Sequence, residues 1–331
     1  MKADSHSKRV KKGLLRHGWT RLTALLVSAA LVATLIVSFV VFFKLIGRRP
    51  EDPLVRMKRH DEAHEILFDS GHNGYRVIFP TSDGLKLTGV VVERPNAHGT
   101  ILFCHGFWRD KESMVRFIDL FPHYHLMLFD FRACGESEGD YTSIGCHEYQ
   151  DVMSAMRFIK NHPVLGATRP HIVFGASMGA AAAIKAASEQ PDIADALILD
   201  SPYACLTEEV EHVFGKMSGL PHYPFFPLMF SMFRWFWGLD EWLLKPELAM
   251  EKIKLPMLLI HSSTDFFTQP HHSIRLYAKA SAHNKRARLW VGPPAKHTDL
   301  YTRYPEYYRH KIGKFLRKLA GWLRNTISIG R

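Results

Sequence analysis

The sequence predicts an α/β fold in which a mostly parallel, eight-stranded sheet carries helices on both faces. Apolar runs typical of strands alternate with segments of helical periodicity between residues 75 and 323, which is characteristic of a doubly wound sheet. The central runs are continuously apolar, as expected for parallel strands that are buried on both faces. The 331 residues are enough for one such domain with an appendage.

Each element of this fold can be placed on the sequence. Strands are expected at 75–80, 85–93, 100–104, 125–130, 171–174, 196–200, 256–261 and 287–291. The turn signal Thr81-Ser82-Asp83-Gly84 joins the first two runs and predicts a hairpin. Helices are expected at 111–121, 146–161, 178–188, 270–280 and 308–323. Together they predict one domain over residues 64–325.

Near the N-terminus, an apolar run without charge, proline or glycine predicts a membrane-spanning helix. The run covers residues 22–43, and about 20 apolar residues cross a bilayer as a helix. Its length and basic flanks favour a retained anchor over a secretory signal or a buried core helix. We therefore expect a basic segment at 1–21, a transmembrane helix at 22–46 and a connector at 47–63. Seven basic residues precede the run and six follow it. The positive-inside rule therefore does not decide on which side of the membrane the catalytic domain lies.

The net charge of +11 is concentrated at the two ends of the chain. Residues 1–60 carry +10 and residues 307–331 carry +7, which leaves −6 for the body between them. Because the body is acidic and shows no nucleic-acid-binding motif, we expect contact with membrane lipids and no nucleic-acid partner. The cations of the last helix fit either contact with anionic lipid or a solvated outer face. They are Arg309, Lys311, Lys314, Arg317, Lys318 and Arg324.

Residues 203–252 interrupt the alternation with an aromatic-rich insertion. It holds eleven of the chain's 40 aromatic residues, nearly twice its share by length. Such a segment fits a helical insertion with its own small core, and it also fits a cap over a hydrophobic substrate pocket. The aromatic residues are Tyr203, Phe214, Tyr223, Phe225, Phe226, Phe230, Phe233, Trp235, Phe236, Trp237 and Trp242.

The pentapeptide Gly175-Ala176-Ser177-Met178-Gly179 indicates a catalytic serine. It has the form Gly-x-Ser-x-Gly and stands between a predicted strand and an alanine-rich helix, the context of a nucleophile elbow. Small residues let two backbones approach closely, and a serine at a helix N-terminus is placed where developing negative charge is favoured. A purely structural turn is the alternative interpretation.

A serine hydroxyl needs a base to take its proton and an acid to orient that base. Sites in open α/β sheets lie beyond the carboxyl ends of the strands, and Asp265 and His297 follow the last two predicted strands. We therefore predict Ser177 as the nucleophile, His297 as the base and Asp265 as the acid. Asp200, which ends the strand after the nucleophile, is a rival for the acid. Asp299 is a second rival, disfavoured because it is so close in sequence to His297.

Two convergent backbone N–H groups are needed to stabilise an oxyanion. We expect one from Met178, the residue after the nucleophile. The other is expected from Phe107, in the loop that opens with His105-Gly106, where glycine permits a turn toward the substrate. His105 itself is expected to be a structural hydrogen-bonding residue.

The four cysteines show no spacing typical of a disulfide framework or a metal site. Cys104 and Cys134 could lie near each other on neighbouring strand ends, which leaves their pairing open. All four are Cys104, Cys134, Cys146 and Cys205.

These motifs resemble the alpha/beta-hydrolase superfamily, nearest its serine-aminopeptidase-like and monoacylglycerol-lipase-like branch. The resemblance covers about residues 75–320 and rests on His105-Gly106, on the Asp-Phe-Arg-Ala-Cys-Gly-Glu-Ser stretch at 130–137, on the pentapeptide and on the Asp265 and His297 loops. The chain departs from the family pattern at Ala133, Ser262 and Lys296, where small residues, mostly glycine, are usual. The resemblance implies hydrolysis through an acyl-enzyme without metal or cofactor. It also implies that 203–252 is a variable cap that selects the substrate.

We therefore expect a membrane-anchored serine hydrolase that cleaves carboxylic ester or thioester bonds of an apolar, lipid-like acyl substrate. A serine peptidase of the same fold is the nearest alternative, and an acidic group of the cap would then bind a free amine; Glu208, Glu209 and Glu211 are candidates. A non-catalytic membrane scaffold that retains the fold is an alternative of another class. The oligomeric state is left open.

Overall fold

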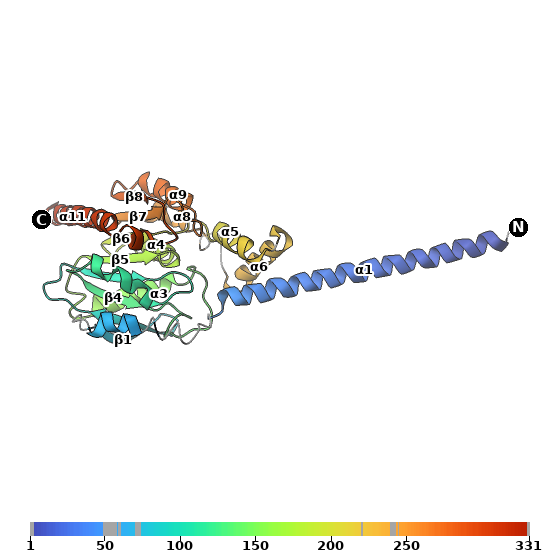
Figure 1. Cartoon of the computed structure of the whole chain (residues 1–331), viewed down its shortest axis with the longest axis horizontal. Coiled ribbons are helices and arrows are strands. Elements are labelled where there is room, and N and C mark those ends of the chain that lie inside the picture. The colour runs from blue at the N-terminus through green and yellow to red at the C-terminus, as the bar shows by residue number, and fades with distance from the viewer. Residues whose placement is uncertain are drawn as a thin grey trace.

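The computed structural model describes residues 3–48, 58, 61–69, 74–219, 221–238, 243 and 245–329. The connector predicted at 47–63 lies mostly outside these residues. So do the side chains of the basic segment up to residue 18 and those of Phe214, Trp237 and Trp242 in the aromatic insertion. Helix α1 (Ala3–Ile46) projects from a body of layered strands and helices (Figure 1).

The body is built on an eight-stranded sheet with the strand order β1-β2-β4-β3-β5-β6-β7-β8. β2 pairs in antiparallel fashion with β1 and β4, and the remaining neighbours are parallel. This confirms the predicted fold class and its eight strands. They are β1 (Gly74–Pro80), β2 (Lys86–Val92), β3 (Thr100–Cys104), β4 (His125–Phe129), β5 (His171–Ala176), β6 (Ala196–Asp200), β7 (Met257–Ser262) and β8 (Ala287–Gly292).

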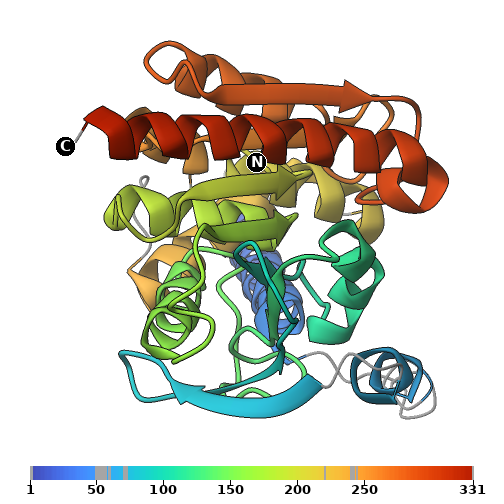
Figure 2. The same ribbon diagram turned by 90° about the vertical axis from the view of Figure 1, so that its left-hand side faces the viewer.

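Side chains alternate along the central strands between two apolar cores, one on each face of the sheet. Leu102 and Val173 belong to the first core, while their neighbours Phe103 and Phe174 belong to the second. The longer helices that contribute to the first core are α3 (Tyr149–Asn161), α4 (Met178–Glu189) and α9 (His271–Ser281). The second core includes residues of the π-helix η1 (Glu65–Asp69), η2 (Lys111–Leu120), α10 (Leu300–Arg303) and α11 (Pro305–Ile329), the last of which crosses the front of Figure 2. Helices therefore cover both faces, as predicted.

Three predicted helices differ in form or extent. Helix α11 (Pro305–Ile329) extends beyond the predicted 308–323 at both ends. The segment predicted at 111–121 is a 3₁₀ helix, and its buried residues Met114, Phe117 and Leu120 recur every three positions, which matches three residues per turn. Helix α3 begins three residues later than predicted. The Glu148 carboxylate accepts a hydrogen bond from the Gly145 backbone N–H at 2.7 Å and holds the preceding residues in a turn.

The aromatic-rich segment forms a helical insertion after β6, as the fold class predicted. It lies beside the body end of α1 (Figure 1). Its elements are α5 (Leu206–Ser218), α6 (His222–Trp237), α8 (Pro246–Ala249) and the 3₁₀ helix η3 (Met250–Lys252).

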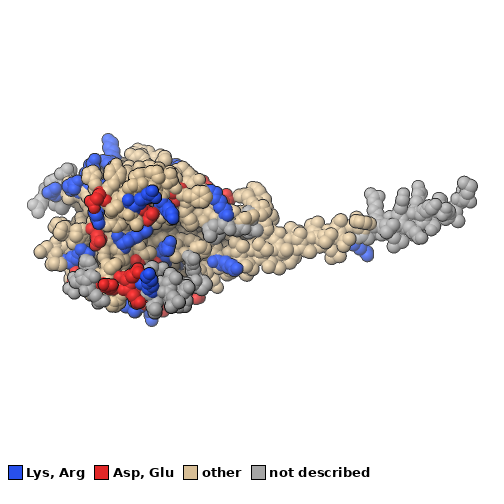
Figure 3. All heavy atoms as spheres, viewed as in Figure 1, with Lys and Arg blue, Asp and Glu red and all other residues tan. Residues whose placement is uncertain are grey.

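Helix α1 contains the apolar segment that the sequence singles out. Its 28-residue part Trp19–Ile46 is long and apolar enough to cross a membrane, and the most apolar 18-residue stretch within it has a mean hydropathy of 2.7 and is only 11% buried. A core helix of a soluble body would be mostly buried. Figure 3 shows the middle of this part of α1 as a rod without charged residues, whereas Lys, Arg, Asp and Glu are frequent on the body. The helix also begins earlier than predicted, because the basic segment continues it without a break.

The last turns of α1 are packed into the body. Phe42 and Ile46 are fully buried in a third apolar core that also contains Phe226 and Phe233 of α6. The Phe42 and Phe233 rings meet edge to face, with their centroids 5.0 Å apart. The Ile46 carbonyl accepts a hydrogen bond from the Thr142 backbone N–H at 2.9 Å. The apolar helix is therefore part of the same core as the insertion.

Candidate active site

Ser177 occupies a strained turn between β5 and α4. Its backbone has φ 54° and ψ −120°, a conformation that residues with a side chain rarely adopt. A Cβ on Gly175 would lie 2.6 Å from Ala180 Cα, and one on Gly179 would lie 2.3 Å from the Cys104 carbonyl oxygen. Both glycines of the pentapeptide are therefore required by close backbone approach. The turn holds the serine at the carboxyl edge of the sheet.

The structure brings Ser177, His297 and Asp265 into one hydrogen-bonded chain. His297 Nε2 lies 2.9 Å from Ser177 Oγ, and His297 Nδ1 lies 2.7 Å from Asp265 Oδ2. Asp265 follows β7 and His297 follows β8, so both loops reach the edge at which β5 ends. This is the arrangement of a nucleophile, a base and an orienting acid.

Asp265 is held as a carboxylate by its hydrogen bonds. Burial alone would raise its pKa, but hydrogen bonds from His261 and His297 outweigh burial and keep the pKa well below the usual range. Its second oxygen, Oδ1, accepts the backbone N–H groups of Phe267 and Thr268, each at 3.0 Å. The carboxylate therefore remains ionised near neutral pH and is oriented toward the imidazole.

The two rival acids are placed elsewhere. Asp200 is fully buried, and its carboxyl oxygens accept hydrogen bonds from the Tyr308 hydroxyl at 2.7 Å and the Ser201 hydroxyl at 2.9 Å. Asp299 precedes α10, and its backbone N–H bonds the Lys296 carbonyl. His297 Nδ1 has Asp265 as its partner. Asp200 instead helps to hold the Ser177 turn, because its backbone carbonyl accepts a hydrogen bond from the Ser177 backbone N–H at 2.8 Å.

Phe107 and Met178 both line a pocket beside Ser177, where the two oxyanion N–H groups were expected. Within the described part of the chain, no backbone hydrogen bond uses either N–H group, and Met178 is the first residue of α4. His105 holds this loop in place. Its Nε2 accepts the Phe131 backbone N–H at 3.0 Å, its Nδ1 donates to the Gly106 carbonyl at 2.8 Å, and burial lowers its pKa.

The pocket beside Ser177 is narrow and almost wholly apolar. Its free volume is about 20 Å³, roughly one water molecule. Helix α5 supplies one wall through Leu206, Val210 and Val213, and Tyr203 and Phe267 close other sides. Residues of the insertion therefore lie directly beside the serine.

Most of the body matches a known family. Residues 101–319 match a model described as the alpha/beta hydrolase family. The chain belongs to this family.

The uncharacterized protein YqkD of Bacillus subtilis is 26% identical over 300 residues, which cover 88% of this chain and 94% of that protein. The lysophosphatidylserine lipase ABHD12 of Mus musculus is 25% identical over 243 residues, which cover 68% of this chain and 56% of that protein. The structure of the Pyrococcus furiosus esterase Pf2001 aligns with a TM-score of 0.63 and 24% identity, covering 76% of this chain and 93% of that one.

Of the three glutamates considered for binding an amine, this alpha/beta hydrolase places Glu209 in the pocket. Glu208 is paired with Arg275, and Glu211 lies 3.9 Å from His222. Burial raises the pKa of Glu209 to about 8. A hydrogen bond from Thr268 opposes this increase, and the negative charge of Asp265 adds to it. The one acidic group of the pocket wall is therefore mostly protonated at pH 7.

Sequence reasoning missed a clasp, a pair of hydrogen bonds between the loop of Asp265 and the loop of His297. Ser262 Oγ donates to the Ala295 carbonyl at 2.7 Å and accepts the Ala295 backbone N–H at 2.8 Å. The clasp ties the loop of Asp265 to the loop of His297. The only signal in the sequence was that Ser262 stands where the family pattern has glycine.

One cluster of potential metal ligands occurs among the described residues. Glu208, His271 and His272 place ligand atoms within 4.8 Å of one another. Arg275 already binds the Glu208 carboxylate, and His272 Nδ1 accepts the Ala204 backbone N–H at 3.2 Å. The cluster therefore does not present a free ligand set. All four cysteines are buried and free, so Cys104 and Cys134 do not pair.

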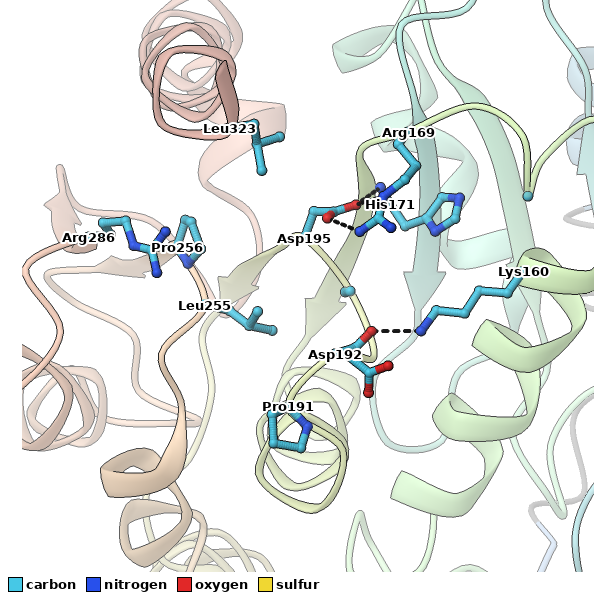
Figure 4. A pocket seen from close by; sticks show the side chains of 12 residues that line it. Lys160, Arg169, His171, Pro191, Asp192, Asp195, Leu255, Pro256, Arg286 and Leu323 are labelled. Carbon is cyan, nitrogen blue, oxygen red and sulfur yellow. Dashed lines mark hydrogen bonds and ion pairs between the residues drawn. The ribbon is translucent and has the colours of Figure 1, made fainter. Parts of the chain in front are cut away.

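A larger hollow, of about 430 Å³, lies at the opposite end of the sheet (Figure 4). It includes His171, where β5 begins, and Pro256, just before β7. Arg169 forms an ion pair with Asp195, and Lys160 Nζ donates to the Asp192 carbonyl at 2.6 Å. Its lining has no serine or cysteine and is remote from the carboxyl edge. Its size therefore does not make it the candidate active site.

Proposed function

We propose that this alpha/beta hydrolase is a membrane-anchored serine hydrolase that cleaves carboxylic ester or thioester bonds of an apolar acyl substrate. The observation that supports it most is the continuous hydrogen-bonded chain from Ser177 Oγ through His297 to Asp265. Ser177 is placed on a strained turn with its oxygen at the carboxyl edge of the sheet. The apolar part of α1 is the proposed anchor.

Ser177 Oγ attacks the acyl carbonyl carbon while His297 Nε2 takes its proton. Asp265 stabilises the resulting imidazolium, and the N–H groups of Phe107 and Met178 hold the oxyanion. His297 then gives the proton to the leaving group, which leaves an acyl-enzyme. Water activated by His297 cleaves that ester and restores Ser177.

An apolar acyl group is favoured over a peptide with a free amine. The wall beside Ser177 is built from aliphatic and aromatic side chains, and Glu209 is mostly protonated at pH 7 and offers little negative charge to an ammonium group. The names of two similar proteins, a lipase and an esterase, point the same way. The pocket is too narrow for a long chain as it stands, so α5 must move when an acyl chain enters.

The full-length protein in neutral detergent should react with a fluorophosphonate probe, and the Ser177→Ala variant should not. A panel of esters of graded chain length, tested with the same two proteins, should show Ser177-dependent hydrolysis that increases with chain length. Labelling that survives in Ser177→Ala would refute the assignment of the nucleophile. Absence of both labelling and hydrolysis in the wild type would favour a non-catalytic scaffold. Faster cleavage of aminoacyl amides than of esters would favour a peptidase.

A further inference from the structure

A second, open hollow adjoins His297, the proposed base. It has a volume of about 360 Å³, within the range of small-molecule sites. It is lined by residues of the loops at 264–267 and 294–297 and by Arg303, where α10 ends. Phe267 lines both this hollow and the apolar pocket, so its ring stands between the two cavities.

Two positive charges without a counter-charge line this hollow. Lys296 and Arg303 are exposed, and no carboxylate in the described part of the chain lies within ion-pair distance of either. Arg303 has only a ring contact, 5.9 Å from the Tyr304 centroid. By contrast, the nearby Arg309 is paired with Glu306 at 2.6 Å. Neither cation is therefore held in an ion pair with a described carboxylate, and both can meet an anionic group that enters the hollow.

The chemistry of the site tells which part of a substrate meets these charges. His297 Nε2 must protonate the leaving oxygen, so the alcohol part of an ester has to lie on the side of His297. The acyl part then lies on the side of Ser177 and Met178, in the apolar pocket. Guanidinium and ammonium groups bind phosphate through charge-assisted hydrogen bonds.

Building on the proposed serine-hydrolase activity, we propose that this hollow binds a phosphate-bearing leaving group, held by Lys296 and Arg303. The substrate class is an acyl ester of a phosphorylated alcohol. The bond between the acyl carbon and the alcohol oxygen breaks as the bond to Ser177 Oγ forms. The proton taken from Ser177 passes through His297 to the alcohol oxygen. The phosphorylated alcohol leaves, and water releases the carboxylic acid in the second step.

The test compares two substrates with the same acyl chain in the same neutral detergent micelles, 1-oleoyl lysophosphatidic acid and 1-oleoylglycerol. The quantity measured is the ratio of kcat/KM for the phosphorylated ester to kcat/KM for the neutral ester. In the double variant Lys296→Ala/Arg303→Ala, this ratio should fall about tenfold, mainly through KM. In the matched variant Lys314→Ala/Lys318→Ala, which removes two exposed cations from α11, it should stay at the wild-type value.

An equal fall in both double variants would show that net charge alone acts and would overturn the proposal, as would an unchanged ratio in the first. Inorganic phosphate tests whether the hollow is a site for the free ion. If phosphate inhibits cleavage of both substrates equally, and Lys296→Ala/Arg303→Ala alone is not inhibited, the hollow binds phosphate without selecting the ester. That result would overturn the proposed substrate class. If the first variant fails to fold, the single variants Lys296→Gln and Arg303→Gln are scored on the same ratio. Absence of Ser177-dependent cleavage of 1-oleoylglycerol and of any other ester would instead contradict the proposed function, independently of the ratio.

Discussion

The loops at the carboxyl edge of the sheet and the insertion beside α1 are held in place by different interactions. The edge is fixed by short, directional hydrogen bonds, such as those of Asp265 and Ser262. The insertion is fixed by apolar contact, in which Phe42 and Ile46 of α1 share a core with Phe226 and Phe233. Hydrogen bonds set the positions of reacting atoms precisely, whereas apolar packing sets the shape of a wall and permits it to shift.

The comparison teaches that the two ends of the site depend on different parts of the chain. The proposed reacting groups depend on the sheet. The proposed acyl pocket depends on Leu206 and Val210, which belong to the same apolar core as the end of the proposed membrane anchor. Removal of α1 would expose that core, so the full-length protein is the proper material for every test. Changes at the edge should alter rate, and changes at the α1 contact should alter stability and chain-length preference.

The largest effect is expected at the edge, from Asp265→Asn. The change keeps the shape of the side chain but removes the charge that orients His297, so kcat should fall on the order of 10⁴-fold with little change in KM. Steady-state kinetics on a short-chain ester measure it. A fall of less than tenfold would mean that another acid orients the base, and Asp200→Asn would then be the next variant to test.

The contact between α1 and α6 should be tested with Phe42→Ala. The ring is fully buried between the two helices, and its loss should cost about 3 kcal/mol in free energy of unfolding. The thermal midpoint in detergent should fall, and activity on long-chain esters should decline more than activity on short ones. Leu35→Ala, at a side chain 53% exposed on the same helix, is the matched control and should change neither. Equal effects of the two variants would contradict a structural role for the α1 contact.

The same division separates what the sequence could predict from what it could not. The strands were predicted because burial on both faces imposes continuous apolar runs, and residues after such runs lie at one edge, which is why Asp265 and His297 could be placed. The clasp of Ser262 on Ala295 joins positions 33 residues apart and leaves no local pattern. The burial of Phe42 against Phe233 was equally hidden, because an apolar residue in a membrane segment is expected to face lipid. Pairings across the fold are set by tertiary contact.

An intermediate effect is expected from Ser262→Ala, which removes the clasp between the two catalytic loops. Its loss leaves the Ala295 N–H group without its partner and leaves the Ala295 carbonyl with only the longer hydrogen bond from Thr264 at 3.4 Å. We expect a cost of about 1–3 kcal/mol and a looser spacing between Asp265 and His297. We expect kcat to fall about tenfold while KM is nearly unchanged. Ser263→Ala, at the exposed neighbouring position, should leave kcat at the wild-type value. A matching fall in both variants would show that the clasp does not position the catalytic pair.

The smallest effect links the two regions through Glu209, which lies on α5 and bonds Thr268 of the edge loop at 2.6 Å. Its pKa is raised to about 8 in the folded protein, above that of an unfolded glutamate, so the folded state holds this proton more tightly. The stabilisation is complete below the unfolded pKa and is lost as pH rises toward about 8. Between pH 7 and pH 8 the loss is at most about 1.4 kcal/mol. Denaturant unfolding of the full-length protein at the two pH values should show it in the wild type, whereas Glu209→Gln, which cannot ionise, should show a smaller change. If the free energy of unfolding falls by the same amount in Glu209→Gln, the pH dependence belongs to other groups. The hydrogen bond between Glu209 and Thr268 would then be the remaining link between α5 and the edge loop.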